Sequence, residues 1–320
     1  MDQFLDGNIF VGIFLPIIIG LVMFTMGLSL KVLDFKRLKE SPKAVFVGIF
    51  AQILGAPIVA FLLANLFGLD PILSVSLMLL AAVPGGPMSN VLCFIADGDV
   101  ALSVSLTAIN SILTIFTIPI IVNVSALYFA STTYSLHLPF WQTVLQMTVI
   151  TLIPIILGML VLKHFPRIAE KVTKVSKLVI PILLIGIVFT AMILEREFFL
   201  SFAKQSAFVA TTLAVLMFAV GHGLGVLFKL SKKQKTSIGV EVGMQNGALA
   251  ISIAASPFLL NVPEAAIVPS AYSFIMGIVV VGYIYLTTRG SSAEHKRKNN
   301  IFLAAFALAI GVMLLLIFVL

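Results

Sequence analysis

Apolar stretches about as long as a bilayer is thick recur along nearly the whole chain. A helix needs about 20 consecutive apolar residues to cross the hydrocarbon core of a membrane. The chain is 60% hydrophobic and only 10% charged, whereas soluble domains contain about 45–50% apolar and about 25% charged residues. We therefore predict an all-α polytopic membrane protein, with no stretch left over that could form a soluble domain of any size.

The apolar pattern divides into about ten predicted transmembrane helices separated by short connections. Their approximate ranges are 9–30, 44–68, 71–96, 100–130, 139–162, 176–194, 202–228, 236–259, 265–288 and 301–320. Consecutive spans are expected to cross the membrane in opposite directions.

The basic residues fall on one side of this predicted topology. Apart from Arg196 and Lys204, every Lys and Arg lies in the connections 31–43, 163–177, 229–235 and 289–298. Because short cytoplasmic loops carry the excess of Lys and Arg, we expect these connections in the cytoplasm and both termini outside. We expect a multi-pass protein of the cell membrane, in bacteria the inner membrane. The net charge of +7 then reflects topology, and no nucleic-acid partner is expected.

Two segments interrupt the apolar pattern in related ways. One is 84–90, in the third span, and the other is 241–247, in the eighth. Pro and Gly weaken a helix, and irregular backbone at membrane depth persists only inside protein or beside a cavity. Spans five apart run in opposite directions, so the pair predicts an inverted repeat with two broken, crossing helices, as in secondary transporters. The alternative is two kinks that serve helix packing.

Glu241 is the only acidic residue well inside a predicted span. A carboxylate at that depth costs about 2.5–3.5 kcal/mol on insertion scales, so it is usually kept to bind or move a charge. We predict a cation site here. The alternative is that Glu241 lies at the cytoplasmic interface, because its span begins near Thr236.

Polar side chains on the third and fourth spans form a second group. Ser89 and Asn90 follow the first break, and Ser103 and Thr107 are one turn apart on one helix face. The stripe continues with Asn110, Ser111 and Thr114. Such hydroxyls commonly bond their own helix or join helices. As a set beside an unwound Ser–Asn pair, they are predicted to form a ligand shell.

The remaining candidate ligands are also hard oxygen donors. Gln52 is the sole strongly polar side chain in an apolar run, and Gln245 lies in the second break. Without His or Cys among the donors, Zn²⁺, Cu and Fe are disfavoured, and Na⁺ is the expected ion. A proton on Glu241 is the competing alternative, because burial disfavours the charged carboxylate. Asp97 and Asp99 lie on a short turn, so we predict no catalytic residues and no enzyme.

These residues resemble the bile acid:sodium symporter family over about residues 9 to 288. The matching motifs are Pro84-Gly85-Gly86 with Ser89-Asn90, Gly98-Asp99-Val100-Ala101-Leu102-Ser103, and Glu241-Val242-Gly243-Met244-Gln245-Asn246. The resemblance implies a panel domain (spans near 9–30, 139–162 and 176–194) and a core domain (spans near 44–130 and 202–288). Residues 1–288 would form the symporter domain, and 289–320 a basic connection with an extra C-terminal helix.

The resemblance also implies two Na⁺ sites behind the crossing and a substrate in the crevice between panel and core. The first Na⁺ site would use Ser89, Asn90, Ser103, Thr107 and Glu241. The second would use Gln52, Glu241, Val242, Met244 and Gln245. The substrate-binding set would be Pro87, Met88, Asn246, Ile275 and Met276. Pro87 replaces a Thr common in bile-acid-transporting relatives, and Ile275 and Met276 replace a His–Asn pair, so sodium coupling is better supported than a bile acid substrate.

We therefore predict a sodium-coupled secondary active symporter of an organic anion, bile-acid-like or a small carboxylate, that works by alternating access. It is expected to need no cofactor apart from two Na⁺ as coupling ions, and to act as a monomer in the lipid bilayer. One alternative is a proton-coupled or uniport organic anion carrier on the same fold. Another is a membrane receptor or scaffold that transports nothing.

Overall fold

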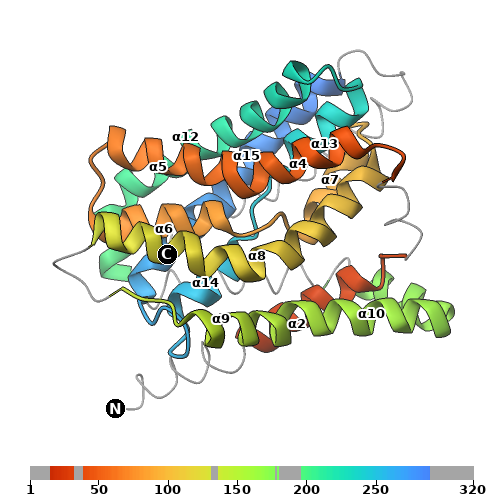
Figure 1. Cartoon of the computed structure of the whole chain (residues 1–320), viewed down its shortest axis with the longest axis horizontal. Coiled ribbons are helices and arrows are strands. Elements are labelled where there is room, and N and C mark those ends of the chain that lie inside the picture. Colours follow the sequence, from red (N-terminus) through yellow and green to blue (C-terminus); the bar gives the residue numbers. More distant parts are fainter. Residues whose placement is uncertain (1–14, 32–38, 131–135, 177–178, 180–195, 289–320) are drawn as a thin grey trace, which may run out of the picture.

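Every regular element of the described residues is a helix (Figure 1). The computed structural model describes residues 15–31, 39–130, 136–176, 179 and 196–288. Within them, five helical segments are long and apolar enough to cross a membrane: Pro42–Leu66, Val100–Phe129, Phe140–His164, Gln205–Leu227 and Pro263–Thr288. The prediction of an all-α, multi-pass membrane protein is confirmed. The predicted tenth span, and nearly all of the sixth, lie outside the described residues.

The helices follow the predicted spans in order. The first two spans are α2 (Leu15–Gly27) and the run α4 (Pro42–Phe50), η3 (Ala51–Gly55) and α5 (Ala56–Leu66). Next come α6 (Pro71–Ala82), α7 (Pro87–Ile95), α8 (Val100–Phe129), α9 (Phe140–Met147), η4 (Thr148–Leu152) and α10 (Ile153–His164). The last are α12 (Arg196–Leu227), α13 (Lys232–Gly243), α14 (Gly247–Ala255), η5 (Pro263–Ala266) and α15 (Ile267–Thr288).

Both predicted interruptions are present, and the two extended segments between the half-helices bond to each other. Gly85 and Gln245 form an isolated antiparallel bridge. Beside it, Asn246 N donates to the Pro84 carbonyl at 2.9 Å and Gly86 N donates to the Met244 carbonyl at 3.3 Å. Backbone polar groups inside a membrane must find partners within the protein. Each break therefore satisfies the backbone that the other break frees.

Two further spans contain a widened, π-helical turn. η3 precedes Pro57, and η4 precedes Pro154. A proline lacks the N–H of a regular helix and collides with the carbonyl four residues earlier, and a π turn relieves this locally. Such turns occur frequently at functional sites, and η3 carries Gln52.

The helices form two groups. α2 lies along α9, η4 and α10 on one side of the molecule, and the other described helices pack together around the crossing (Figure 1). Gly27 and Gly158 allow α2 and α10 to approach closely, because a Cβ on either glycine would overlap the backbone of the other helix. Small residues are the usual means of close helix packing in lipid.

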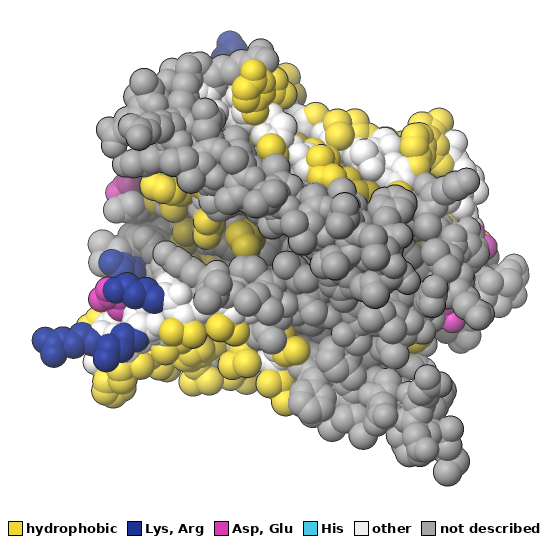
Figure 2. Space-filling model, turned by 180° about the vertical axis from the view of Figure 1, so that it is seen from behind, with side chains coloured by type: hydrophobic (Ala, Val, Ile, Leu, Met, Phe, Trp, Pro, Cys, Tyr) yellow, Lys and Arg dark blue, Asp and Glu magenta, His cyan; other side chains and the backbone are white. Residues whose placement is uncertain are grey.

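The surface has the character of a membrane protein. Large apolar side chains such as Leu127 and Trp141 are 73% and 77% exposed. Figure 2 shows hydrophobic side chains over much of the described surface, with the visible Lys and Arg gathered mostly toward one end. The exposed apolar side chains suit contact with lipid, and the charge asymmetry agrees with the one-sided distribution of basic residues in the sequence.

Candidate functional site

Glu241 is fully buried and lies on α13, shortly before the second break. A capping box of Ser231 and Gln234 starts this helix, which fixes how deep Glu241 sits. It is the only acidic residue among the buried side chains of the described ranges. The alternative that Glu241 lies at the interface is therefore not supported by the structure.

One carboxylate oxygen of Glu241 is surrounded by hydroxyl groups. Ser89 Oγ and Thr107 Oγ1 donate to Oε2 at 2.8 and 2.9 Å, and Ser103 Oγ donates at 3.3 Å. Asn90 joins indirectly, since its Oδ1 accepts from Ser103 at 2.9 Å and from Thr107 at 3.3 Å. The structure thus brings together all five residues of the predicted first ion site, from α7, α8 and α13.

The other carboxylate oxygen has a different environment. Glu241 Oε1 and Gln52 Oε1 are both buried and have no hydrogen-bond partner among the described residues. Gln52 is held by its Nε2, which donates to the Val83 carbonyl at 2.9 Å and to Gln245 Oε1 at 3.2 Å. Unpaired buried acceptors are costly and call for an explanation. Two such oxygens are a donor set that suits a hard cation.

The other members of the predicted second set are also at this place. Gln245 Nε2 donates to the Val242 carbonyl at 2.8 Å, and the Met244 carbonyl accepts from Gly86 N. All five residues therefore lie on η3, α13 or the break that follows α13, and Glu241 is common to both sets.

Two residues outside the predicted ion and substrate sets also shape this region. A Cβ on Gly85 would lie 2.7 Å from Glu241 Oε1 and 3.0 Å from the Glu241 carbonyl oxygen, so only glycine fits there. Tyr272 Oη donates to the Gly243 carbonyl at 2.8 Å and holds the end of α13. The contact of Tyr272 could have been anticipated, because a tyrosine hydroxyl in an apolar span needs a hydrogen-bond partner. The collision at Gly85 depends on a residue far away in the sequence.

The turn between α7 and α8 is tied to α13. Ser237 Oγ accepts from Asp99 N at 2.7 Å and lies 3.2 Å from Cys93 Sγ. The Asp99 carboxylate caps α8 by accepting from Leu102 N at 3.1 Å. These contacts give Asp99 a structural role, in agreement with the prediction that it is not catalytic.

The predicted substrate residues lie on elements that meet near the crossing. Asn246 caps α14 by accepting from Leu249 N at 3.1 Å, and its Nδ2 has no partner in the described part of the chain. Pro87 begins α7 and Met88 is partly buried. Ile275 and Met276 are partly buried on α15, which packs against α7 and α14.

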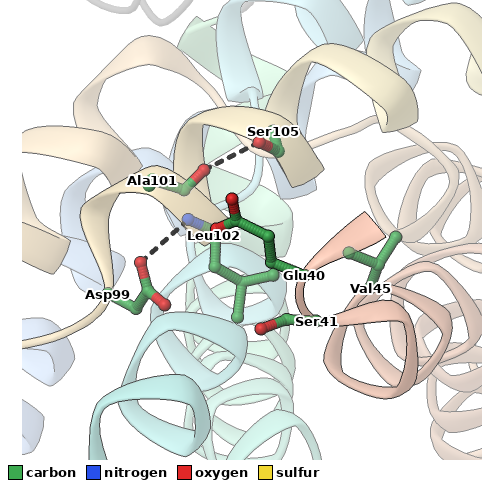
Figure 3. Close-up of a pocket in the computed structure, with 7 residues that line it drawn as sticks. All are labelled: Glu40, Ser41, Val45, Asp99, Ala101, Leu102 and Ser105. Carbon is green, nitrogen blue, oxygen red and sulfur yellow. Dashed lines mark hydrogen bonds between the residues drawn. The ribbon is translucent and has the colours of Figure 1, made fainter. Parts of the chain in front are cut away.

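A small pocket lies elsewhere, where α4 and α8 begin (Figure 3). Its volume is about 170 Å³, and it is lined by Glu40, Ser41, Val45, Asp99, Ala101, Leu102 and Ser105. None of these belongs to the candidate ion or substrate sets. Pockets for drug-sized ligands usually measure about 300–1,000 Å³, so this one does not suit an organic anion of bile acid size.

Other chemistries find little support in the described residues. No group of three or more His, Cys, Asp or Glu side chains there could hold a metal. His222 is hydrogen bonded, with Nδ1 2.8 Å from Tyr283 Oη.

In many secondary transporters the coupling ions are held where transmembrane helices are broken, and here a buried carboxylate lies beside two such breaks. Comparison with known proteins identifies the class as sodium-dependent transporters, and the protein is not an enzyme. The model of the Sodium Bile acid symporter family matches residues 16–202, and the chain belongs to this family. The predicted family resemblance is confirmed.

Three relatives illustrate the range of the family. The chain is 31% identical to the uncharacterized sodium-dependent transporter YocS of Bacillus subtilis, over 89% of this chain and 87% of YocS. It is 30% identical to the probable sodium/metabolite cotransporter BASS2 of rice chloroplasts, over 77% of this chain and 58% of the relative. It is 25% identical to the mouse sodium-dependent organic anion transporter, over 88% of this chain and 76% of the relative.

Proposed function

We propose that this protein is a sodium-coupled secondary active symporter of an organic anion that works by alternating access. The observation that carries the proposal is the environment of Glu241. Its Oε2 is bonded by three hydroxyls, while its Oε1 lies unpaired at the crossing, in the same donor set as the unpaired Oε1 of Gln52. Hydroxyl, amide and carboxylate oxygens are the donors that hard cations prefer.

Two Na⁺ would share this carboxylate. The first would be held by Ser89, Asn90, Ser103, Thr107 and Glu241, and the second by Gln52, Glu241, Val242, Met244 and Gln245. Two cations on one carboxylate leave a net positive charge, which favours a monoanionic substrate. The N-termini of α7 and α14 start at the breaks, and their dipoles add positive potential there.

The substrate would bind beside the crossing, at Pro87, Met88, Asn246, Ile275 and Met276. The mouse relative is named for organic anion transport, and the unpaired Nδ2 of Asn246 is a donor suited to a carboxylate. Only one of the five side chains is strongly polar. The set therefore fits an anion with a sizeable apolar part.

Alternating access would move the panel against the core. The panel would contain α2, α9 and α10 with the span near 176–194, and the core would contain the spans near 44–130 and 202–288. Substrate shifts the balance between inward and outward states only through its different affinity for the two. We further propose a monomer in the bacterial inner membrane with both termini outside, in which the 289–320 segment is peripheral.

Purified protein in proteoliposomes tests the proposal. A thermal-shift screen of organic anions (bile salts, 2-keto acids and hydroxy acids) is run in Na⁺ and in K⁺ buffer. A ligand that binds only the folded protein stabilises it by an amount that grows with the ratio of ligand concentration to Kd. The expected result is an anion whose stabilisation requires Na⁺ and whose uptake follows an inward Na⁺ gradient. Binding without accumulation would overturn the proposal and favour a receptor.

A proton is the second candidate coupling ion. Glu241 is fully buried, and its unpaired Oε1 is a possible protonation site. Uptake driven equally well by a pH gradient in Na⁺-free buffer would favour this alternative, and uptake driven by neither gradient would favour a uniporter.

A further inference from the structure

The polar stripe on α8 continues well past the candidate ion site. Its members are Ser103, Thr107, Asn110, Thr114 and Thr117, which follow one another at steps of four, three, four and three residues. At 100° and 1.5 Å per residue, such a row occupies an arc of about 80° and a length of about 21 Å. The row is therefore a continuous line along one face of the helix.

The two halves of this row have different hydrogen bonding. Ser103 and Thr107 bond Glu241 and Asn90. Asn110 is fully buried, and neither its Nδ2 nor its Oδ1 has a partner in the described ranges. Thr117 Oγ1 is likewise buried without a partner there.

The neighbouring hydroxyls provide no partner for Asn110. Thr114 Oγ1 donates to the main-chain carbonyl of Asn110 at 2.7 Å, and Ser111 Oγ donates to that of Thr107 at 2.7 Å. An amide with nothing to bond in a membrane interior is costly, and such groups in native proteins call for an unseen water, an ion or a functional role. Asn110 is the next polar member of the row after Thr107.

We propose that Asn110 and Thr117 line the path by which Na⁺ reaches the first ion site from the Phe129 end of α8. This proposal rests on the proposed function. The two side chains supply neutral oxygens, which replace part of the water shell of a hard cation without trapping it, as in ion pathways generally. Successive members of the row are about 4.5–6 Å apart along the helix axis, so the ion would move in short steps.

The row extends to the end of α8 with one apolar interruption. Ile121 is partly buried at the next position of the stripe, and beyond it lie Ser125 and Tyr128. Tyr128 Oη donates to Asn65 Oδ1 at 3.2 Å, where both side chains are exposed. In the proposed orientation this is the external end, so Na⁺ would enter between these polar groups and pass Ile121 before it meets Thr117.

The test compares two properties of the full-length protein: the initial rate of Na⁺-dependent uptake and the equilibrium affinity for Na⁺. The ratio kcat/KM for Na⁺, from initial uptake at low Na⁺, reports on productive entry, and the Na⁺ concentration at half-maximal thermal stabilisation reports on affinity. Asn110→Leu should lower kcat/KM about tenfold or more, a change of about 1.4 kcal/mol in the barrier. Its thermal midpoint in K⁺ should stay the same or rise, and its equilibrium affinity should change less than about twofold.

Thr117→Val is the second variant, and Thr143→Val is its matched control. Thr143 Oγ1 is also buried without a described partner, but it lies on α9. Thr117→Val should lower kcat/KM about threefold, and Thr143→Val should leave it unchanged. If Asn110→Leu does not fold, Thr117→Val and Asn110→Ser decide the question, and Asn110→Ser should keep more activity than any apolar replacement.

Two results would overturn the path. One is a normal kcat/KM in both Asn110→Leu and Thr117→Val, as expected if Asn110 only bonds a buried water. The other is an equal loss of rate and equilibrium affinity, which would make Asn110 part of the ion site itself. A wild-type protein that Na⁺ does not stabilise would instead contradict the proposed function.

Discussion

The two oxygens of the Glu241 carboxylate lie in unlike surroundings. Oε2 accepts from the hydroxyls of Ser89, Ser103 and Thr107, whereas Oε1 has no described partner. A hydroxyl can donate its hydrogen to the carboxylate or turn a lone pair toward a cation. The amide oxygen of Gln52 can only accept. The hydroxyl side is therefore satisfied with or without an ion, and the amide side depends on one.

The largest effect is expected from replacing Glu241, because its carboxylate belongs to both the hydroxyl side and the amide side. Glu241→Ala should abolish Na⁺-driven uptake and Na⁺-dependent thermal stabilisation, because both proposed Na⁺ sites would lose their one charged ligand. Membrane insertion should persist, since removing a charge makes the span easier to insert. Uptake in proteoliposomes checks the first point and membrane fractionation the second. Full Na⁺-dependent transport by this variant would remove Glu241 from the ion sites.

Gln52→Ala tests the amide side alone. It should lower Na⁺-driven uptake at least about 100-fold, equivalent to about 2.7 kcal/mol, because Glu241 Oε1 would then be the one unpaired side-chain oxygen left in the second set of described residues. Na⁺ titrations of thermal stability should change from a two-ion to a one-ion dependence. An unchanged two-ion curve would place the second ion elsewhere.

Gly85→Ala disturbs the unpaired oxygen by sterics without removing a ligand. The new methyl group would lie 2.7 Å from Glu241 Oε1, so the carboxylate must shift. Overpacking of this kind costs about 1–3 kcal/mol, and Na⁺ affinity should fall about tenfold in thermal-shift titrations. The control is Gly223→Ala on α12, where a Cβ meets nothing within 4 Å and affinity should not change. Equal effects at both glycines would indicate general damage to the fold.

Thr107→Val removes one of the three hydroxyls on the satisfied side. The loss of one hydrogen bond to a charged group costs about 1.5–3 kcal/mol. We expect lower thermal stability already in K⁺ buffer and an approximately tenfold weaker response to Na⁺. Gln52→Ala should show the Na⁺ effect more strongly, so the ratio of the two losses measures the difference between the two sides. Normal thermal stability of Thr107→Val in K⁺ buffer would contradict the claim that the hydroxyls stabilise Glu241 Oε2 in the absence of Na⁺.

Ser111→Ala has the smallest expected effect. Ser111 Oγ donates to the Thr107 carbonyl within its own helix, and such hydroxyls contribute little to a neighbouring site. Uptake and Na⁺ affinity should stay within about twofold of wild type. A larger loss would mean that polarity along α8, and not the contacts with Glu241, sets ion affinity.

Local patterns predicted much of the fold and of the candidate site. The depth of Glu241, the two breaks and the face shared by Ser103 and Thr107 follow from span length, Pro and Gly positions and helical spacing. Contacts between residues far apart in the sequence could not be predicted in the same way. The collision that requires glycine at Gly85 involves a side chain on α13, and the unpaired amide of Asn110 becomes visible only when its neighbours are known. Pro57 and Pro154 in apolar runs were available signals for the two π turns, although proline alone does not distinguish a π turn from a kink.

The close contact between Gly27 and Gly158 has a consequence for biosynthesis. α2 leaves the ribosome before α4 through α8, yet its packing partner α10 follows them. The hydrophobic effect does not drive helices together in lipid, where close packing must do so. The close contact at Gly27 can therefore form only after the segment around Gly158 has been inserted. During translation, α2 must therefore wait in the bilayer while the helices between it and α10 are inserted. A bulkier residue at either glycine should accordingly delay or prevent the packing of α2 against α10 and leave earlier insertion intact.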